Sequence, residues 1–311
     1  MHIAGGLRLP MFLLDNWGLL LKLGALTRAL GGVKGLKAIS EWERYYLAQT
    51  AEAVFQCTDC RRPASEFARL VKALAEAKGV LKEDCRIHAE RPRRRWPTLL
   101  DEYFSLVEDV VLSRACELAV KPVRDVVPEE EARALYQALV SGDYYSAYRT
   151  ALYTAFEVPK WGKVLLVGAG TQEPLDFITA CGVLNVPCRF AAMEVDEDVY
   201  KDLKRLAERH GFEVHLGWDN TPSNFDGAVV QNVLHWASSP TDVLARTRAA
   251  AKRMLLSQGV IEGAGVGFLL TYVLGAQRAV SWREVDAAAE AAGWKKRRRY
   301  AKYPVYIAVF A

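Results

Sequence analysis

The chain has 311 residues, of which 51% are hydrophobic and 25% are charged, a composition typical of globular proteins and long enough to bury one large core or two smaller ones. The formal net charge of +4 is modest, so charge alone does not indicate a nucleic-acid-binding protein. Basic residues cluster at 91–96 and 295–303. Two interpretations of these clusters are open: contact with nucleic acid or anionic lipid, or an ordinary solvated surface.

No uncharged apolar stretch reaches the roughly 18 residues that a membrane span needs. The apolar segment 10–30 is interrupted by Asp15, Lys22 and Arg28. Six cysteines in a chain of this size do not indicate a secreted disulfide scaffold, so we expect a cytoplasmic protein without a membrane anchor. Sparse Asn and Gln beside abundant Ala, Arg, Glu and Leu suit a thermophilic source.

The N-terminal half is predicted to be helical. The segment 63–79 begins with proline and Ser65, carries apolar residues at helical spacing and ends at Gly79. The segment that follows, 80–92, is short and alternating and predicts a small hairpin. Further helices are predicted over 18–30, 40–55, 98–120 and 128–140. Helices followed by a hairpin are the order of a winged-helix unit, although this order also arises by chance in helical segments.

The cysteines of this half allow three interpretations. Cys57, Cys60, Cys85 and His88 form a C-x2-C and C-x2-H pattern that a tetrahedral zinc ion would suit. The long spacer is outside the commonest zinc-finger spacings, so a disulfide or reduced thiols compete with zinc and we assign no metal. We expect Cys181 and Cys188, farther along the chain, to pack as ordinary buried residues.

The pattern changes near Trp161, where strand-like runs begin to alternate with helices. This alternation predicts a parallel sheet covered on both faces. Strands are predicted within 163–168, 188–195, 212–218, 225–233 and 252–261, and helices from 174 and over 196–211, 240–251 and 281–294. The runs 295–303 and 304–311 follow each other without a helix, so the final strand is expected to be antiparallel. We therefore place a helical domain at 1–155 and an α/β domain at 156–311.

The turn after the first of these strands, "VLLVGAGTQEP", has Gly168 and Gly170 but Glu173 where a dinucleotide-binding fingerprint has its third glycine. A carboxylate beside a pyrophosphate is repulsive, which disfavours NAD and FAD. S-adenosylmethionine carries no phosphate and is cationic, so it tolerates this carboxylate while using the close backbone approach that the glycines permit.

Carboxylates after the next strands fit the same ligand. Glu194 ends the second strand, at the distance from the turn at which an acidic residue accepts the ribose hydroxyls in a βαβ unit. Asp219 follows the third strand and would accept the adenine amino group, although a turn or capping role is equally compatible with its position. Ala169, Val195, Asn220 and Gln231 are their neighbours at the same edge and complete the expected cofactor site.

These residues, with the fourth strand at 225–233, resemble the class I S-adenosylmethionine-dependent methyltransferases over roughly the last 150 residues. The resemblance implies a Rossmann-like sheet of seven strands with the last one antiparallel. It also implies that Gly168 and Gly170 hold the methionine part, Glu194 the ribose and Asp219 the adenine. Gln172 occupies a position where the family often has a further glycine.

A helical N-terminal half before such a domain is similar to the small-molecule O-methyltransferases, in which a histidine after the fourth strand is the catalytic base. This resemblance implies that His235 has that role, that the acceptor is a small apolar or aromatic hydroxyl compound, and that the N-terminal helices form a homodimer. The tryptophan in "LHW" comes one residue early, so a packing or cofactor-contact role for His235 stays open.

Two alternatives keep parts of this interpretation. An RNA methyltransferase would use the same cofactor, with the basic and aromatic tract 295–303 contacting phosphates and bases. A winged-helix binding protein with a vestigial cofactor fold would not be an enzyme and would bind no cofactor. Trp218 and Trp236 flank the expected site, although tryptophans in such places more often belong to the core.

Overall fold

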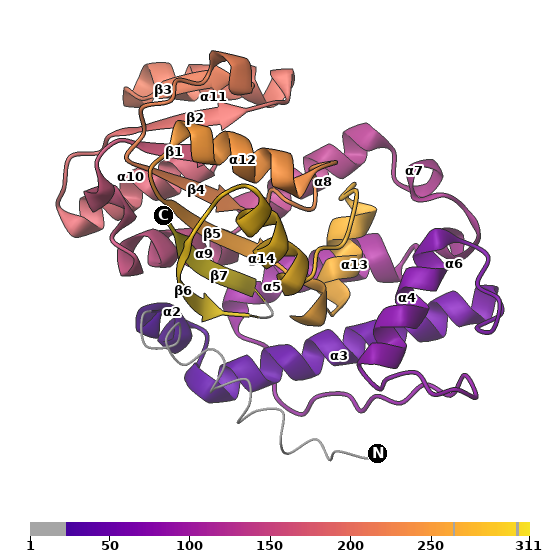
Figure 1. Cartoon of the computed structure of the whole chain (residues 1–311). Helices are drawn as coiled ribbons and strands as arrows, with labels where there is room; N and C mark the ends of the chain where they lie inside the picture. The colour runs from indigo at the N-terminus through magenta and orange to yellow at the C-terminus, as the bar shows by residue number, and fades with distance from the viewer. Residues whose placement is uncertain (1–22, 264, 303–304) are drawn as a thin grey trace. The chain divides into compact units, whose positions relative to one another are not determined.

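The computed structural model describes residues 23–263, 265–302 and 305–311 (Figure 1). Its chain divides into two compact units. One is helical and comprises 27–145 with the segment 265–276, and the other contains the sheet and comprises the described residues 23–26, 146–263, 277–302 and 305–311. Most of the apolar segment 10–30 and the start of the helix predicted over 18–30 lie outside the described residues. Helix α2 (Gly24–Ala29) is the described part of that prediction.

The helical unit is built from α3, α4, α5, α6, α7, α8 and α13, with bounds Gly32–Cys57, Glu66–Ala77, Asp101–Leu106, Ala115–Val120, Val123–Val126, Glu129–Ser141 and Val266–Val273. The helix predicted over 63–79 is confirmed as α4. Ser65 caps it, because its Oγ accepts a hydrogen bond of 3.0 Å from the Ala68 N–H. Segment 265–276, between strand β5 (Met254–Gly259) and helix α14 (Trp282–Ala291), belongs to this unit although it lies far along the chain.

The single helix predicted over 98–120 is wrong in detail. Helix α5 continues into a π-helical turn over Val107–Leu112, in which the Ser113 N–H donates to the Glu108 carbonyl at 2.9 Å, and α6 begins afterwards. The buried side chains Val107, Val110 and Val111 keep a spacing that an ordinary helix would also show. Apolar periodicity therefore could not reveal the wider turn.

The small hairpin predicted over 80–92 forms only at its turn, where the Lys82 N–H donates to the Arg86 carbonyl at 3.0 Å and the His88 N–H donates to the Val80 carbonyl at 2.8 Å. Within that segment, all of which is described, Leu81 and Ile87 form one isolated antiparallel bridge and no strand follows. A disulfide joins Cys60 to Cys85, with 6.1 Å between their Cα atoms, and holds this segment to the end of α3. The disulfide and these few backbone hydrogen bonds hold the segment in place of an extended strand ladder. The two-stranded wing that a winged-helix unit requires does not form here.

The zinc alternative is wrong as well, because the cysteines pair with one another. Besides the bond from Cys60 to Cys85, Cys57 is bonded to Cys116 in α6, a partner that the local spacing does not indicate. Among the described residues, no group of three or more His, Cys, Asp or Glu side chains is placed to hold a metal ion. Cys181 and Cys188, expected to pack separately, form a third disulfide.

The second unit is confirmed as a seven-stranded mixed sheet with the order β3-β2-β1-β4-β5-β7-β6 (Figure 1). Strand β7 alone is antiparallel to its neighbours, β5 and β6. The strand bounds, from β1 to β7, are Val164–Val167, Phe190–Glu194, Glu213–Leu216, Gly227–Gln231, Met254–Gly259, Lys296–Ala301 and Val305–Phe310. Every residue of β1, β2 and β4 is buried, as expected for central parallel strands.

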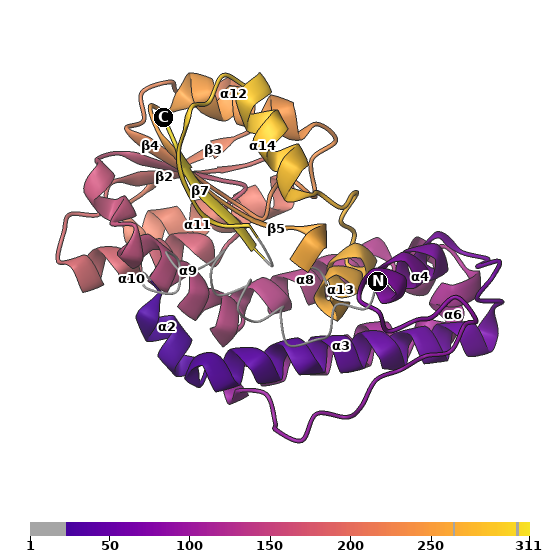
Figure 2. The same ribbon diagram turned by 60° about the horizontal axis from the view of Figure 1, so that its bottom comes forward.

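Helices cover both faces of this sheet (Figure 2). Helices α12 (Pro240–Ala250) and α14 (Trp282–Ala291) lie on one face, where Leu244 and Val285 join the core formed by the strands. Helices α9 (Asp143–Ala155), α10 (Glu173–Leu184) and α11 (Glu197–His210) lie on the other. Helices α9 and α13 are not among the helices predicted from the sequence.

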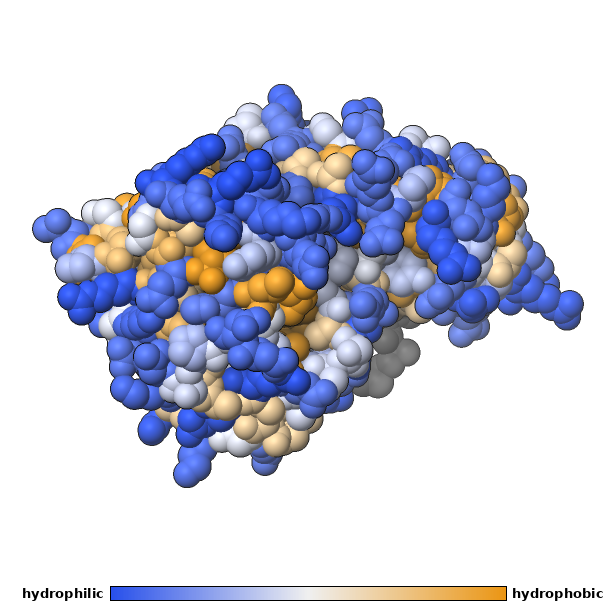
Figure 3. Space-filling view, turned by 90° about the horizontal axis from the view of Figure 1, so that it is seen from above, coloured by the Kyte–Doolittle hydropathy of each residue, from blue (hydrophilic) through white to orange (hydrophobic). Residues whose placement is uncertain are grey.

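No described helix is long and apolar enough to cross a membrane. The face of the molecule in Figure 3 is covered mainly by hydrophilic side chains, with smaller apolar areas between them.

Candidate cofactor and acceptor site

The candidate site lies at the carboxyl ends of the central strands. Strand β1 pairs in parallel with β2 on one side and with β4 on the other, so the chain order reverses beside β1. At such a switch point, the loops after the two neighbouring strands diverge and leave room for a ligand. The fold therefore brings together the loops after β1, β2 and β4, which hold the residues singled out in the sequence.

The turn after β1 depends on its two glycines. Gly168 and Gly170 have φ values of 62° and 56°, in the left-handed region that favours glycine. A Cβ atom on Gly168 would lie 3.0 Å from Val233 Cγ2, so this glycine lets the loop after β4 approach closely. A Cβ on Gly170 would meet nothing within 4 Å. Gly170 thus borders open space, and Ala169 between the glycines is buried.

Glu194 is held against this turn. Its Oε2 accepts a hydrogen bond of 3.2 Å from the Gly170 N–H, and its Oε1 accepts from the Val195 N–H at 2.7 Å and from the Asp196 N–H at 3.3 Å. Burial raises the pKa of Glu194, and these backbone donors act in the opposite direction. Two carboxylate oxygens offer about four acceptor sites, so capacity remains for a ligand hydroxyl. The Val195 side chain is 66% exposed.

A second carboxyl group lies buried at the start of α10. Burial raises the pKa of Glu173 to about 8, so at neutral pH this side chain is predominantly protonated. The Tyr153 hydroxyl is hydrogen-bonded to Glu173 Oε1 and lies 3.1 Å from Gln231 Oε1. With Glu173 protonated, its O–H donates to the tyrosine oxygen and the tyrosine O–H donates to Gln231.

This chain of donors fixes the amide of Gln231, the last residue of β4. Its oxygen faces Tyr153, and its Nε2 is buried without a hydrogen-bond partner among the described residues. A buried donor without an acceptor is costly. Gln231 Nε2 is therefore a group that a ligand acceptor would satisfy.

The residues after β3 are placed differently. The Asp219 side chain is 97% exposed and pairs with Arg246 Nη1 across 3.5 Å. Asn220 Nδ2 donates to the Leu216 carbonyl at 2.7 Å and so stabilises its own turn. Neither side chain is hydrogen-bonded to the glycine turn, which contrasts with the tight contact between Gly170 and Glu194.

His235 lies in the loop after β4 and is 7% exposed. Its Nδ1 is 2.8 Å from Nε2 of Gln258, a residue of β5. Its Nε2 is buried and has no hydrogen-bond partner among the described residues. Burial lowers the pKa of His235 to about 4, so the imidazole is neutral at physiological pH.

Tyr153, Gln258 and the Arg149–Asp176 ion pair are the site-supporting residues that sequence analysis missed. Tyr153 belongs to α9, a helix that was not predicted, and Gln258 is a polar residue within a buried strand. Arg149 pairs with Asp176 in the buried layer between α9 and α10, and Ser146 donates to the same carboxylate at 2.6 Å. The sequence signal for Gln258 is a polar residue within a strand that is otherwise mostly apolar.

Residues 296–301 of the basic tract form the edge strand β6, and intramolecular contacts engage part of the charge of this strand. Lys296 Nζ is 2.6 Å from Asp286 Oδ2, and Arg299 Nη1 is 3.4 Å from the same oxygen. The Arg298 guanidinium lies 4.9 Å from the centre of the Tyr300 ring. Charged residues on an edge strand also prevent unwanted strand pairing.

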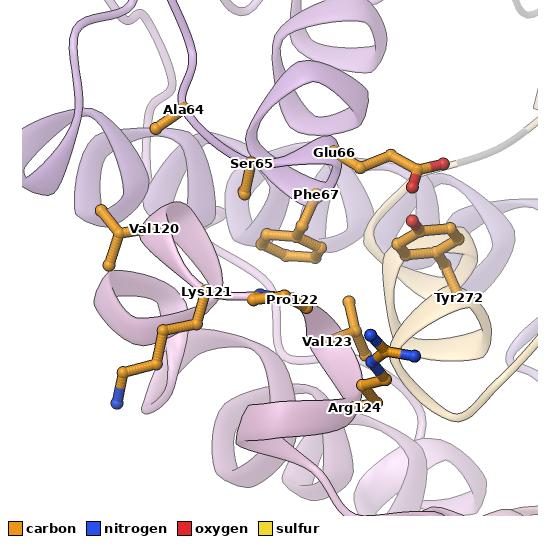
Figure 4. A pocket seen from close by; sticks show the side chains of 10 residues that line it. All are labelled: Ala64, Ser65, Glu66, Phe67, Val120, Lys121, Pro122, Val123, Arg124 and Tyr272. Carbon is orange, nitrogen blue, oxygen red and sulfur yellow. The ribbon is translucent and has the colours of Figure 1, made fainter.

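The helical unit has a surface pocket of its own (Figure 4). It is lined by the start of α4 and by the connection from α6 to α7, with Tyr272 from α13 beside Glu66. Lys121 Nζ at this pocket is paired with Glu117 at 2.8 Å, and Arg124 is 3.9 Å from Asp125. Because its cations have internal partners, we assign no anion site here.

No profile of a known protein family and no curated protein matches the chain. Among solved structures, the carbon methyltransferase DszA has a TM-score of 0.63 at 14% identity and covers 93% of each chain. The CMeT domain of the citrinin polyketide synthase has a TM-score of 0.60 at 10% identity and covers 96% of this chain and 97% of its own. This chain therefore has the fold found in those methyltransferases along nearly its whole length.

Proposed function

We propose that the chain is an S-adenosylmethionine-dependent methyltransferase that acts on a small molecule. The observation that carries the proposal is the contact of Glu194 with Gly170 in a turn that borders open space. A carboxylate at the end of the second strand accepts ribose hydroxyls, and its negative charge suits a cationic ligand. The fold shared with two methyltransferases supports the same conclusion.

The residues present fit this cofactor. Gly168 and Gly170 allow a ligand to approach the backbone, Glu194 would accept from the ribose, and Gln231 Nε2 would donate to a carboxylate. Asp219 remains our proposal for the adenine contact, with the backbone near Asn220 beside it. When bound, the cofactor supplies an electrophilic methyl group on a sulfonium. The chain's contribution is to orient the acceptor and to exclude water.

Our leading proposal for the acceptor is a small apolar or aromatic hydroxyl compound that is methylated on oxygen. A carbon acceptor is the second candidate, because the two solved structures compared above are the carbon methyltransferase DszA and a polyketide synthase CMeT domain. RNA is less well supported, since Asp286 neutralises part of the basic strand β6.

The acceptor class is tested by incubating the purified chain with methyl-labelled S-adenosylmethionine and three kinds of acceptor: phenols, β-dicarbonyl compounds and bulk RNA. We expect label in the phenol or dicarbonyl fraction. Label in RNA alone, together with a salt-sensitive mobility shift, would overturn the small-molecule proposal.

A further inference from the structure

The hydrogen bonds of Gln258 determine which way its side-chain amide points. Its Oε1 accepts a hydrogen bond of 3.0 Å from the backbone N–H of Leu234, and its Nε2 donates to the Gly259 carbonyl at 3.0 Å. Rotating the amide by half a turn would set N–H against N–H and oxygen against oxygen. The Gln258 nitrogen must therefore be the atom that faces His235.

This orientation fixes the tautomer of His235. Gln258 Nε2 carries only protons to donate, so His235 Nδ1, 2.8 Å away, must be the acceptor. A neutral imidazole with an unprotonated Nδ1 carries its proton on Nε2. A carboxylate at position 258 would have selected the opposite tautomer and would have stabilised the imidazolium.

The protonated Nε2 is then a donor without an acceptor. It is buried, and among the described residues it has no hydrogen-bond partner. It belongs to the loop after β4, whose Val233 borders the glycine turn. Buried donors in native proteins are nearly always satisfied, so this one is available to a ligand at the carboxyl edge of the sheet.

We propose that His235 donates its Nε2–H to an ionised oxygen of the methyl acceptor, and that Gln258 is the positioning residue that holds the imidazole in this tautomer. This inference rests on the proposed function. It replaces the general-base role, because an Nε2 that carries a proton cannot accept one. Burial lowers the pKa of His235, so the imidazole also resists taking up a second proton.

The proposal defines the acceptor by its chemistry. Without a base at His235, the acceptor must lose its proton to solvent before transfer, as acidic phenols and enolised β-dicarbonyl compounds do. The methyl carbon then forms a bond to the acceptor oxygen or to the enolate carbon. Its bond to sulfur breaks, and the sulfur keeps the electron pair. A hydrogen bond to the oxyanion orients it and stabilises its charge.

The first experiment determines the tautomer by NMR of protein with isotopically labelled imidazole nitrogens, with and without S-adenosylhomocysteine. His235→Gln identifies the signals of this residue. We expect a protonated Nε2 and an unprotonated Nδ1. A protonated Nδ1 would overturn the proposal whether or not the protein is active.

Gln258 variants test the positioning role. Gln258→Glu is expected to move the proton to Nδ1 and to raise the pKa of His235, and Gln258→Met is expected to leave a mixture of tautomers. The methionine variant retains a similar volume and introduces no buried charge, so it serves if the glutamate variant does not fold. An unchanged tautomer in the folded variants would contradict the role of Gln258.

The second experiment titrates para-nitrophenol and acetylacetone into the protein saturated with S-adenosylhomocysteine. We expect the phenolate or the enolate to shift the Nε2 proton signal, and we expect that loss of the donor in His235→Phe weakens binding about tenfold. His235→Gln, which retains an amide donor, should bind more tightly than His235→Phe. A signal that moves with neither probe at their highest concentrations overturns the oxyanion role.

The two probes separate an oxygen acceptor from a carbon acceptor. Calorimetry with S-adenosylhomocysteine on the unchanged protein reports separately on the proposed function. Failure of that binding would therefore be distinguished from failure of the role assigned to His235.

Discussion

The backbone N–H of Gly170 donates a hydrogen bond of 3.2 Å to Oε2 of Glu194, and this contact joins the turn after β1 to the end of β2. It places a carboxylate at the end of β2, where an acidic side chain accepts ribose hydroxyls. The same carboxylate is held by the Val195 and Asp196 N–H groups, so its position is set before any ligand binds.

Glu194→Gln is expected to weaken binding of S-adenosylhomocysteine about tenfold or more, because a hydrogen bond to a charged group contributes roughly 1.5–3 kcal/mol. Isothermal titration calorimetry measures the change. Glu197→Gln, at the exposed start of α11, is the matched control and should bind normally. Equal affinities for the two variants would argue against a ribose contact at Glu194.

The two glycines of the turn should respond differently to alanine. Both substitutions incur the left-handed backbone penalty of roughly 1–2 kcal/mol. Gly168→Ala also brings its Cβ to 3.0 Å from Val233, so it should lower the free energy of unfolding further than Gly170→Ala. Adding Val233→Ala should recover part of that extra loss if the collision is its cause. Chemical denaturation provides the comparison, and equal losses without rescue would contradict the geometry.

Glu173 should make stability depend on pH. Its pKa is about 8 in the folded chain, above the ordinary value of 4.5 expected when the chain is unfolded, so the folded state binds the extra proton between these values. The contribution is fully present below about pH 4.5 and is lost as the pH rises through about 8. The free energy of unfolding of the original chain should therefore fall by an amount on the order of a few kcal/mol over this pH window, and Glu173→Gln should not show this fall.

The measurement for Glu173 is a series of denaturation curves from pH 5 to pH 9, a span chosen to cover the pKa of about 8. Glu208→Gln, on the exposed face of α11, is the control and should keep the slope of the original chain. If the free energy of unfolding changed with pH by the same slope in the original chain and in both variants, Glu173 would not be buried as a neutral acid.

A disulfide that encloses a longer stretch of chain should stabilise the fold more, although the gain rises only with the logarithm of the loop length. The bond between Cys57 and Cys116 spans 59 residues, whereas that between Cys181 and Cys188 spans 7. Loop-closure entropy gives roughly 4 kcal/mol for the first and roughly 2.5 kcal/mol for the second. Paired alanine substitutions with unfolding curves test the order. Peptide mapping without reductant checks the connectivity, and free thiols in the mapped peptides would exclude it.

The sheet was predictable because its signals are local. Runs such as "KVLLVG" and "CRFAAMEV" alternate with amphipathic helices, and two strand-like runs without a helix between them indicated the antiparallel end. The position of Glu194 one βαβ unit after the glycine turn followed from the same regular geometry, since parallel strands end at one edge.

The features of the fold and of the site that were not predicted depend on contacts between residues far apart in the sequence. Nothing near Cys57 indicates Cys116 as its partner, and the pairing becomes visible only when α3 and α6 pack together. The role of Gln258 is equally hidden, because a single amide in a buried strand acquires meaning through Leu234 and His235. The sequence "LHW" left a base and a packing role for His235 open, and the inferred position of its proton depends on Gln258 in the neighbouring strand.

The proposed function requires that the turn after β1 bind a cationic, phosphate-free nucleoside. The most direct test is calorimetric titration of the unchanged chain with S-adenosylmethionine, S-adenosylhomocysteine and NAD under one set of conditions. We expect micromolar or tighter binding of the first two, on the order of −8 kcal/mol, with NAD much weaker. Tight binding of NAD, or no binding of either sulfur nucleoside, would contradict it.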